Sequence, residues 1–172
     1  MTKLRVILGP GAFGAPASMR AHVEGLRARG VAAEAVALPR GRAERAAEVF
    51  GALAAPDVVV GGHSFGGRAA SLAAADVEFA GLLLFGFPLA GRGEERTRHL
   101  ARLRCPALAL QGEADELAPI DDVRRLFAAA PQIRLVVYPG ADHRLHGSLG
   151  PALDEAARFV RGLEALRRSE FG

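Results

Sequence analysis

Residues 58–71 read VVVGGHSFGGRAAS, and this stretch decides the fold that we expect. Its run of valines is typical of a strand that is covered on both faces, and the alanine-rich residues after it favour a helix. Between them lies the pattern G-x-S-x-G, in which Gly62 and Gly66 flank Ser64. A side chain at either glycine would crowd a tight turn, so the spacing predicts a sharp strand-to-helix turn that exposes Ser64. The pattern also arises by chance in a chain with 21 glycines, and Ser64 would then only cap the helix.

Strand-like and helix-like segments alternate along the rest of the chain. This alternation predicts a three-layer α/β/α fold, with a mostly parallel sheet between two layers of helices. The whole chain, residues 1–172, is long enough to form one domain with a proper core. We expect strands at residues 4–8, 33–38, 58–61, 80–85, 107–111 and 134–138, and helices at 16–29, 42–53, 65–75, 119–129 and 151–168.

Composition excludes several classes of protein. Half of the residues are apolar and 24% are charged, which is ordinary for a soluble globular protein. No apolar run is long enough for a membrane helix, and no signal peptide is visible, so no membrane partner is expected. The basic residues are scattered among 19 acids, which argues against nucleic-acid binding. The single cysteine, Cys105, excludes an internal disulfide and fits a small buried side chain in a cytoplasmic protein.

Two later motifs supply what a serine nucleophile needs, namely a base and an acid that orients the base. Residues 111–119 read QGEADELAP and place Asp115 after an apolar strand, with Glu113 and Glu116 as alternative acids. Residues 134–147 read RLVVYPGADHRLHG and place His143 after the next strand, with His146 as the alternative base. Parallel strands end at one edge of a sheet, so these side chains are expected to lie near Ser64.

The three motifs, in this chain order, closely resemble those of the alpha/beta-hydrolase superfamily. The likeness is to its small, lidless, esterase-like branch, near the dienelactone-hydrolase-like and acyl-thioesterase-like proteins. The family pattern selects Asp115 and His143. Asp142 precedes the base and is expected to shape its loop or to be solvated. His146 is expected at the surface or at the pocket rim, and His63 is expected to pack or hydrogen-bond under the turn. The resemblance implies six strands in the order 2-1-3-4-5-6, without the superfamily's N-terminal hairpin or a lid domain. It also implies that neither a metal nor an organic cofactor is needed.

Residues 9–16, GPGAFGAP, contain a G-x-G-x-x-G pattern that suggests a nucleotide cradle as an alternative. The acid that this motif requires is poorly placed, because Glu34 falls near the start of the second strand. Pro10 also removes an N–H from the turn. In the hydrolase interpretation the loop supplies an oxyanion-hole donor, which is the N–H of Ala12 or alternatively that of Phe13. Relatives often carry a histidine where this chain has Pro10.

The resemblance implies a serine hydrolase that cleaves a small carboxylic ester or thioester through an acyl-enzyme, with the N–H of Phe65 as the other oxyanion donor. The alternatives are a hydrolase-fold binding protein with little turnover and a nucleotide-binding α/β protein. The sequence does not indicate the oligomeric state.

Residues 86–104 form a long connection that is either functional or a solvated excursion. Apolar side chains beside strand ends could form a pocket wall or pack in the core: Phe13, Phe65, Phe87, Leu89, Leu117 and Leu145. Three arginines could meet an acidic substrate or remain solvated: Arg92, Arg96 and Arg144.

Overall fold

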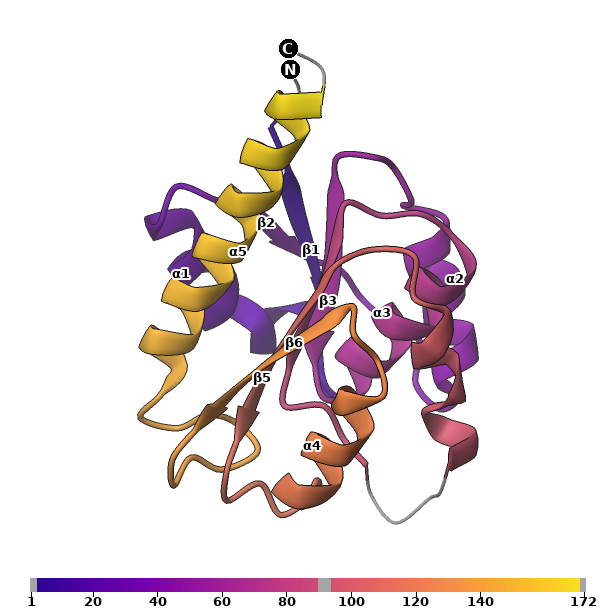
Figure 1. Ribbon diagram of the computed structural model, residues 1–172, viewed down its shortest axis with the longest axis vertical. Helices are drawn as coiled ribbons and strands as arrows, with labels where there is room; N and C mark the ends of the chain where they lie inside the picture. Colours follow the sequence, from indigo (N-terminus) through magenta and orange to yellow (C-terminus); the bar gives the residue numbers. More distant parts are fainter. Residues whose placement is uncertain (1–2, 90–93, 171–172) are drawn as a thin grey trace.

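A computed structural model describes residues 3–89 and 94–170 of the chain. Within these residues, six strands form one sheet in the order β2-β1-β3-β4-β5-β6, with every neighbouring pair parallel (Figure 1). The predicted strand order and the α/β fold class are therefore confirmed. The strands are β1 (Arg5–Gly9), β2 (Ala32–Ala35), β3 (Val58–His63), β4 (Gly81–Phe85), β5 (Ala107–Gly112) and β6 (Ile133–Tyr138).

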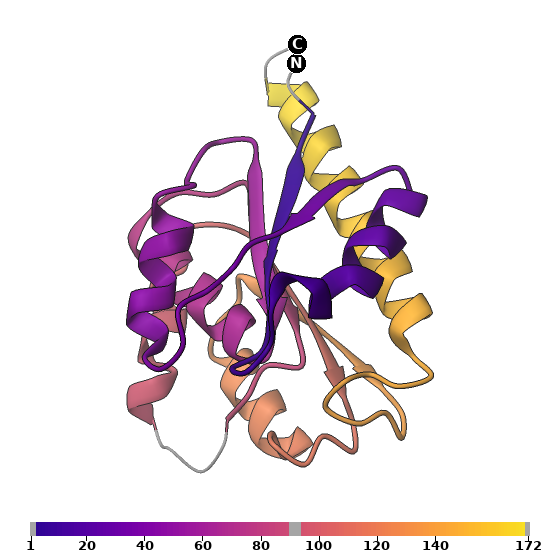
Figure 2. The same cartoon turned by 180° about the vertical axis from the view of Figure 1, so that it is seen from behind.

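Helices cover both faces of the sheet and complete the three layers (Figures 1 and 2). Alternate residues of one strand serve the two faces, as Ile7 belongs to the core on the α2/α3 side and Val6 and Leu8 to the core on the α1/α5 side. The helices are α1 (Arg20–Ala28), α2 (Ala43–Gly51), α3 (Phe65–Asp76), α4 (Ile120–Ala128) and α5 (Leu149–Glu170), with short 3-10 turns η1 (Pro16–Met19), η2 (Glu94–Arg96) and η3 (Arg98–Arg102).

Several element ends differ from the expected ones. Strand β2 ends at Ala35, although the N–H of Val36 still donates to the carbonyl of Leu8 at 3.0 Å. Helix α5 begins at Leu149, so Pro151 lies inside its first turn, where an N–H has no partner within the helix. The long connection at 86–104 contains η2 and η3, while its residues 90–93 lie outside the described residues. None of the described helices has the length and apolar character needed to cross a membrane.

The junction of β1, β3 and α3 brings three backbone segments unusually close together. Gly9 pairs with Gly62 in the sheet register. A Cβ atom added to Gly62 would lie 2.3 Å from the carbonyl oxygen of Gly9, and one added to Gly66 would lie 2.1 Å from the same atom. Both distances fall below any real contact of a Cβ atom, so this junction requires glycine at both positions.

Gly66→Ala should therefore lower the free energy of unfolding by about 1–3 kcal/mol or more, because rigid backbone occupies the space of the new methyl group. Gly162→Ala is the matched control, since Gly162 lies in α5 with no atom within 4 Å of its added Cβ. This control should raise stability by roughly 0.5–1 kcal/mol. Urea denaturation of both variants measures the difference, and equal stability of the two would contradict this account of the junction.

Candidate active site

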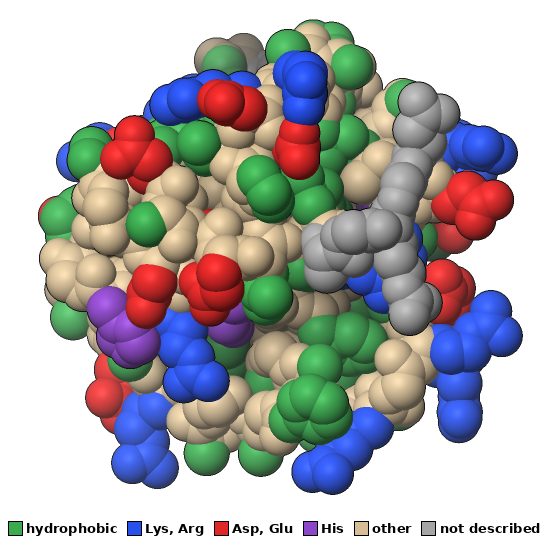
Figure 3. Space-filling model, turned by 90° about the horizontal axis from the view of Figure 1, so that it is seen from below, with side chains coloured by type: hydrophobic (Ala, Val, Ile, Leu, Met, Phe, Trp, Pro, Cys, Tyr) green, Lys and Arg blue, Asp and Glu red, His purple; other side chains and the backbone are tan. Residues whose placement is uncertain are grey.

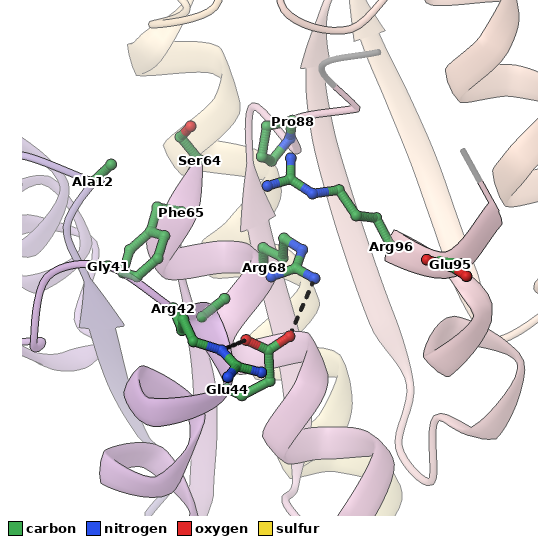
Figure 4. Close-up of a pocket in the computed structure, with 11 residues that line it drawn as sticks. Ala12, Gly41, Arg42, Glu44, Ser64, Phe65, Arg68, Pro88, Glu95 and Arg96 are labelled. Carbon is green, nitrogen blue, oxygen red and sulfur yellow. Dashed lines mark ion pairs between the residues drawn. The ribbon is translucent and has the colours of Figure 1, made fainter. Parts of the chain in front are cut away.

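Ser64 occupies a strained turn between β3 and α3. Its backbone angles are φ 51° and ψ −116°, a conformation that costs a non-glycine residue about 1–3 kcal/mol. The N–H of Ser64 donates to the carbonyl of Phe85 at 3.0 Å, and its carbonyl accepts from the N–H of Arg68 at 3.0 Å. The turn is thus held by β4 on one side and by the first turn of α3 on the other. Figure 4 shows the Ser64 side chain at the start of α3, directed away from the helix.

Asp115 follows β5 and is 4% exposed. Its Oδ2 accepts a hydrogen bond from Nε2 of Gln111 at 2.6 Å, and its Oδ1 accepts one from the N–H of Leu117 at 2.8 Å. Its Oδ2 also lies 2.8 Å from Nδ1 of His143. Donors therefore contact both carboxylate oxygens, which fixes the orientation of the carboxylate.

His143 has one ring nitrogen engaged and one available. Nδ1 faces Oδ2 of Asp115, so Nδ1 carries the ring hydrogen and donates a hydrogen bond to the carboxylate. Nε2 is buried and has no hydrogen-bond partner among the described residues. A cavity of about 470 Å³ is lined by His143, Ser64, His63, His22 and Leu117, among others. The structure therefore brings Ser64, His143 and Asp115 together at the carboxyl edge of the sheet, where Ser64 and His143 line the same cavity.

Two glycines at strand ends allow the segment that carries His143 to cross the sheet edge. Gly86 follows β4 with φ 62°, and an added Cβ would lie 2.5 Å from the carbonyl oxygen of His143. Gly112 ends β5, and an added Cβ would lie 2.3 Å from the carbonyl oxygens of Ala141 and Asp142. The His143 segment thus packs directly on the ends of two strands, and this packing fixes the position of the imidazole relative to the sheet.

The neighbouring titratable residues support this segment. Nε2–H of His63 donates to the carbonyl of His143 at 3.1 Å, which confirms its expected hydrogen-bonding position under the turn. Asp142 shapes the loop as expected, because its Oδ1 accepts from the N–H groups of Arg144 and His146. These bonds and the His146 side chain lower the pKa of Asp142 to about 2. His146 is exposed and pairs with Asp142, while Glu113 accepts from the N–H of Gly140 at 3.1 Å.

The glycine loop after β1 lies against the Ser64 turn. Ala12 and Phe13 line the 470 Å³ cavity, and Ala12 also lines a second cavity of about 850 Å³ together with Ser64 and Phe65. Ser64 therefore lines both cavities. Figure 3 looks onto this end of the molecule, where the surface is indented near its centre.

The structure distributes the expected pocket residues over different environments. Phe13 and Leu117 border the cavity beside His143, and Phe13 is 87% exposed. Phe87 and Leu145 are each 1% exposed and pack in the two hydrophobic cores, so neither side chain is available to a substrate. Leu89 packs partly buried against the core on the α2/α3 side. Burial also raises the pKa of the Cys105 thiol to about 11, in line with its expected packing role.

Gln111 and Arg68 are site residues that sequence reasoning missed. The amide of Gln111 is fully buried and joins Asp115 to the N–H of Phe87, which donates to its Oε1 at 2.9 Å. The signal was a polar residue ending the apolar run ALALQ, because a buried amide must find partners. Arg68 is 9% exposed and lines the 850 Å³ cavity one helical turn after Ser64.

His22 should make stability depend on pH. Burial, together with the nearby His63, lowers the pKa of His22 to about 4. The unfolded chain therefore binds more protons than the folded chain between about pH 6.5 and pH 4, and stability falls as the pH drops through this range. NMR titration should show the His22 ring protonating near pH 4, and His22→Gln should flatten the loss of stability on acidification. A His22 titration near pH 6.5 would contradict this expectation.

Solved structures with the same fold include several hydrolases. An N-formylmaleamic acid deformylase from Pseudomonas putida aligns with a TM-score of 0.73 and 19% identity, over 84% of this chain and 87% of its own. Est1E from Butyrivibrio proteoclasticus gives 0.75 and 17%, over 95% and 89%. A butyrate-bound esterase from Thermogutta terrifontis gives 0.73 and 16%, over 94% and 84%. At these identities, the alignments show a shared fold and nothing more.

The match to a family model is more direct. Residues 19–157 match a model described as an alpha/beta hydrolase domain, and this range includes Ser64, Asp115 and His143. No curated protein matches the sequence. Because the family model covers most of the chain, and because the six-stranded parallel sheet agrees with it, the chain belongs to the alpha/beta hydrolase family of enzymes.

Proposed function

We propose that the chain is a serine hydrolase that cleaves a small carboxylic ester or thioester, with Ser64 as nucleophile, His143 as base and Asp115 as the orienting acid. The observation that carries the proposal is the state of the His143 ring. Its Nδ1 lies against a buried carboxylate, its buried Nε2 has no hydrogen-bond partner among the described residues, and His143 lines the same cavity as Ser64. Such an imidazole is prepared to accept a proton from a serine hydroxyl.

In the acylation step, Oγ of Ser64 attacks the carbonyl carbon as its proton moves to Nε2 of His143. The tetrahedral intermediate then collapses, the bond to the leaving oxygen or sulfur breaks, and His143 returns the proton to the leaving alcohol or thiol. Asp115 stabilises the imidazolium that forms between these two events. A water molecule, deprotonated by the same Nε2, then attacks the acyl-enzyme and releases the carboxylic acid and Ser64.

The negative charge of the tetrahedral oxygen needs donors that are already in place. The N–H of Phe65, at the start of α3, is one candidate, and the partial positive charge of this helix end adds to it. The N–H of Ala12 is the second, because Ala12 lines both cavities beside Ser64, and Phe13 is its alternative. Pro10 has no N–H, which leaves the donors of this loop to the residues after it.

Two further observations bear on the substrate class. The two cavities beside Ser64 measure about 470 and 850 Å³, in the range of sites for small molecules. The T. terrifontis esterase was solved with butyrate bound, which supports a short acyl group for the present chain by analogy. A choice between ester and thioester rests on a substrate panel, and a single domain and a cytoplasmic location stay predictions.

Ser64→Ala should lower kcat for p-nitrophenyl esters and acyl-thioesters by roughly 10⁴–10⁶, because it removes the nucleophile. A fluorophosphonate probe should label the parent and leave this variant unlabelled. Ser169→Ala, which removes an exposed serine near the end of α5, is the control and should match the parent. Full activity of Ser64→Ala would refute the proposal, and a parent that neither turns over nor reacts with the probe would favour a binding protein.

Gln111→Met should lower kcat by roughly tenfold to a hundredfold, since it removes one donor to Asp115 and the acceptor of the Phe87 N–H. The KM should change much less, because Gln111 lies behind Asp115 and away from the cavities. Steady-state kinetics with a thermal melt separates this effect from unfolding. An unchanged kcat in a folded variant would show that Asp115 is oriented without Gln111.

A further inference from the structure

The 850 Å³ cavity has a chemical character that differs from the histidine-lined cavity on the other side of Ser64. Among the described residues, its charged lining consists of three arginines and two glutamates: Arg42, Arg68, Arg96, Glu44 and Glu95. This described part of the lining carries one net positive charge. Figure 4 shows these side chains below and beside Ser64, with the Arg96 guanidinium extending toward Arg68.

Among these charged residues, Arg68 is distinguished by its burial and its hydrogen bonding. It is 9% exposed, and its Nε is buried without a hydrogen-bond partner among the described residues. Its ion pair with Glu44 is 3.7 Å long, and Glu44 is shared with Arg42 at the same distance. A buried guanidinium whose ion pair is long, and whose carboxylate partner is shared with another arginine, can still donate hydrogen bonds to a further group.

Arg96 adds a second cation to the same space. Burial lowers the pKa of Arg68 from its ordinary value, and repulsion from the positive charge of Arg96 lowers it further. An anion placed between two such groups would relieve this repulsion and accept charge-assisted hydrogen bonds.

The segment that carries Arg96 is fixed to the helix that carries Arg68. His99, three residues further along, is buried, and its Nε2 lies 2.8 Å from Oγ of Ser71 in α3. Burial lowers the pKa of His99 to about 4, so its ring is neutral near pH 7. Since Ser71 donates to the carbonyl of Arg68 at 2.7 Å, the ring N–H of His99 donates to Ser71. This buried chain of hydrogen bonds fixes the segment that carries Arg96 relative to the helix that carries Arg68.

We propose that this cavity binds a carboxylate at the far end of the substrate, through Arg68 and Arg96. The inference rests on the proposed function, because it places the carboxylate on the same molecule as the carbonyl that Ser64 attacks. The single net positive charge of the described lining matches a carboxylate better than a phosphate, which carries nearly two negative charges. Ser64 and Arg68 line the same cavity, and their backbone positions are about 6 Å apart along the helix axis, so the half-ester of a short dicarboxylic acid is the probe of choice.

The test compares two esters that differ only at this end. Mono-p-nitrophenyl adipate carries the carboxylate, and the p-nitrophenyl ester of adipic acid monoamide is its uncharged counterpart. The parent should show a kcat/KM ratio of charged to uncharged ester of about ten to a hundred, the usual contribution of hydrogen bonds to a charged group. Arg68→Met and Arg96→Gln should each lower this ratio about tenfold or more, and Arg124→Gln, on exposed α4, should leave it unchanged.

The outcomes distinguish a failure of the carboxylate site from a failure of the proposed function. Cleavage of both esters with a ratio near one, or a ratio that neither arginine variant alters, would overturn the carboxylate site and leave the proposed function intact. Failure to cleave either ester, with no fluorophosphonate labelling, would instead refute the proposed function. A phosphonate in place of the carboxylate should give a lower kcat/KM, and a higher value would identify a phosphate site. Arg96 is only half-buried, so Arg96→Gln keeps the test decisive if Arg68→Met fails to fold.

Discussion

The close approach of the Gly9 carbonyl to the turn around Ser64 is the constraint on which the rest of the site depends. Only glycine at positions 62 and 66 allows β1 and the start of α3 to approach this closely. This contact brings the loop after β1 beside Ser64, and it is compatible with the strained φ of 51° at the serine. The same contact therefore sets the distance between the candidate nucleophile and the backbone groups proposed to stabilise the oxyanion.

A second close packing sets the position of the imidazole. The carbonyl of His143 faces Gly86, and the carbonyls of residues 141 and 142 face Gly112, so the loop rests on the ends of β4 and β5. His63 adds a hydrogen bond from β3 to the same loop. Three central strands thus determine where one histidine lies, although the loop itself follows the edge strand β6.

The sequence predicted the strand order because each buried strand is a local apolar run and parallel crossovers leave few topologies. It could not predict where β2 ends, since Val36 and Leu38 are apolar enough for a strand but pack against the core beyond the ladder. The motifs identified Ser64, Asp115 and His143, which the structure brings to one edge. Gln111 escaped notice because its partner Phe87 lies 24 residues away in the chain, a relation that only the fold reveals. For Leu145 the sequence left both a pocket wall and the core open, and the structure buries its side chain in the core. Its φ of 58° belongs to a loop whose course the sequence does not encode locally.

The charged cavity is built from separate parts of the chain. Glu44 comes from α2 and Arg96 from η2, whereas Ser64, Asp115 and His143 follow β3, β5 and β6. Substitutions at positions 44 and 96 therefore change the charge that a substrate meets without touching the glycine junction that constrains the serine. Substrate preference can therefore be altered along this surface while the turn that carries Ser64 keeps its steric requirement for glycine at positions 62 and 66.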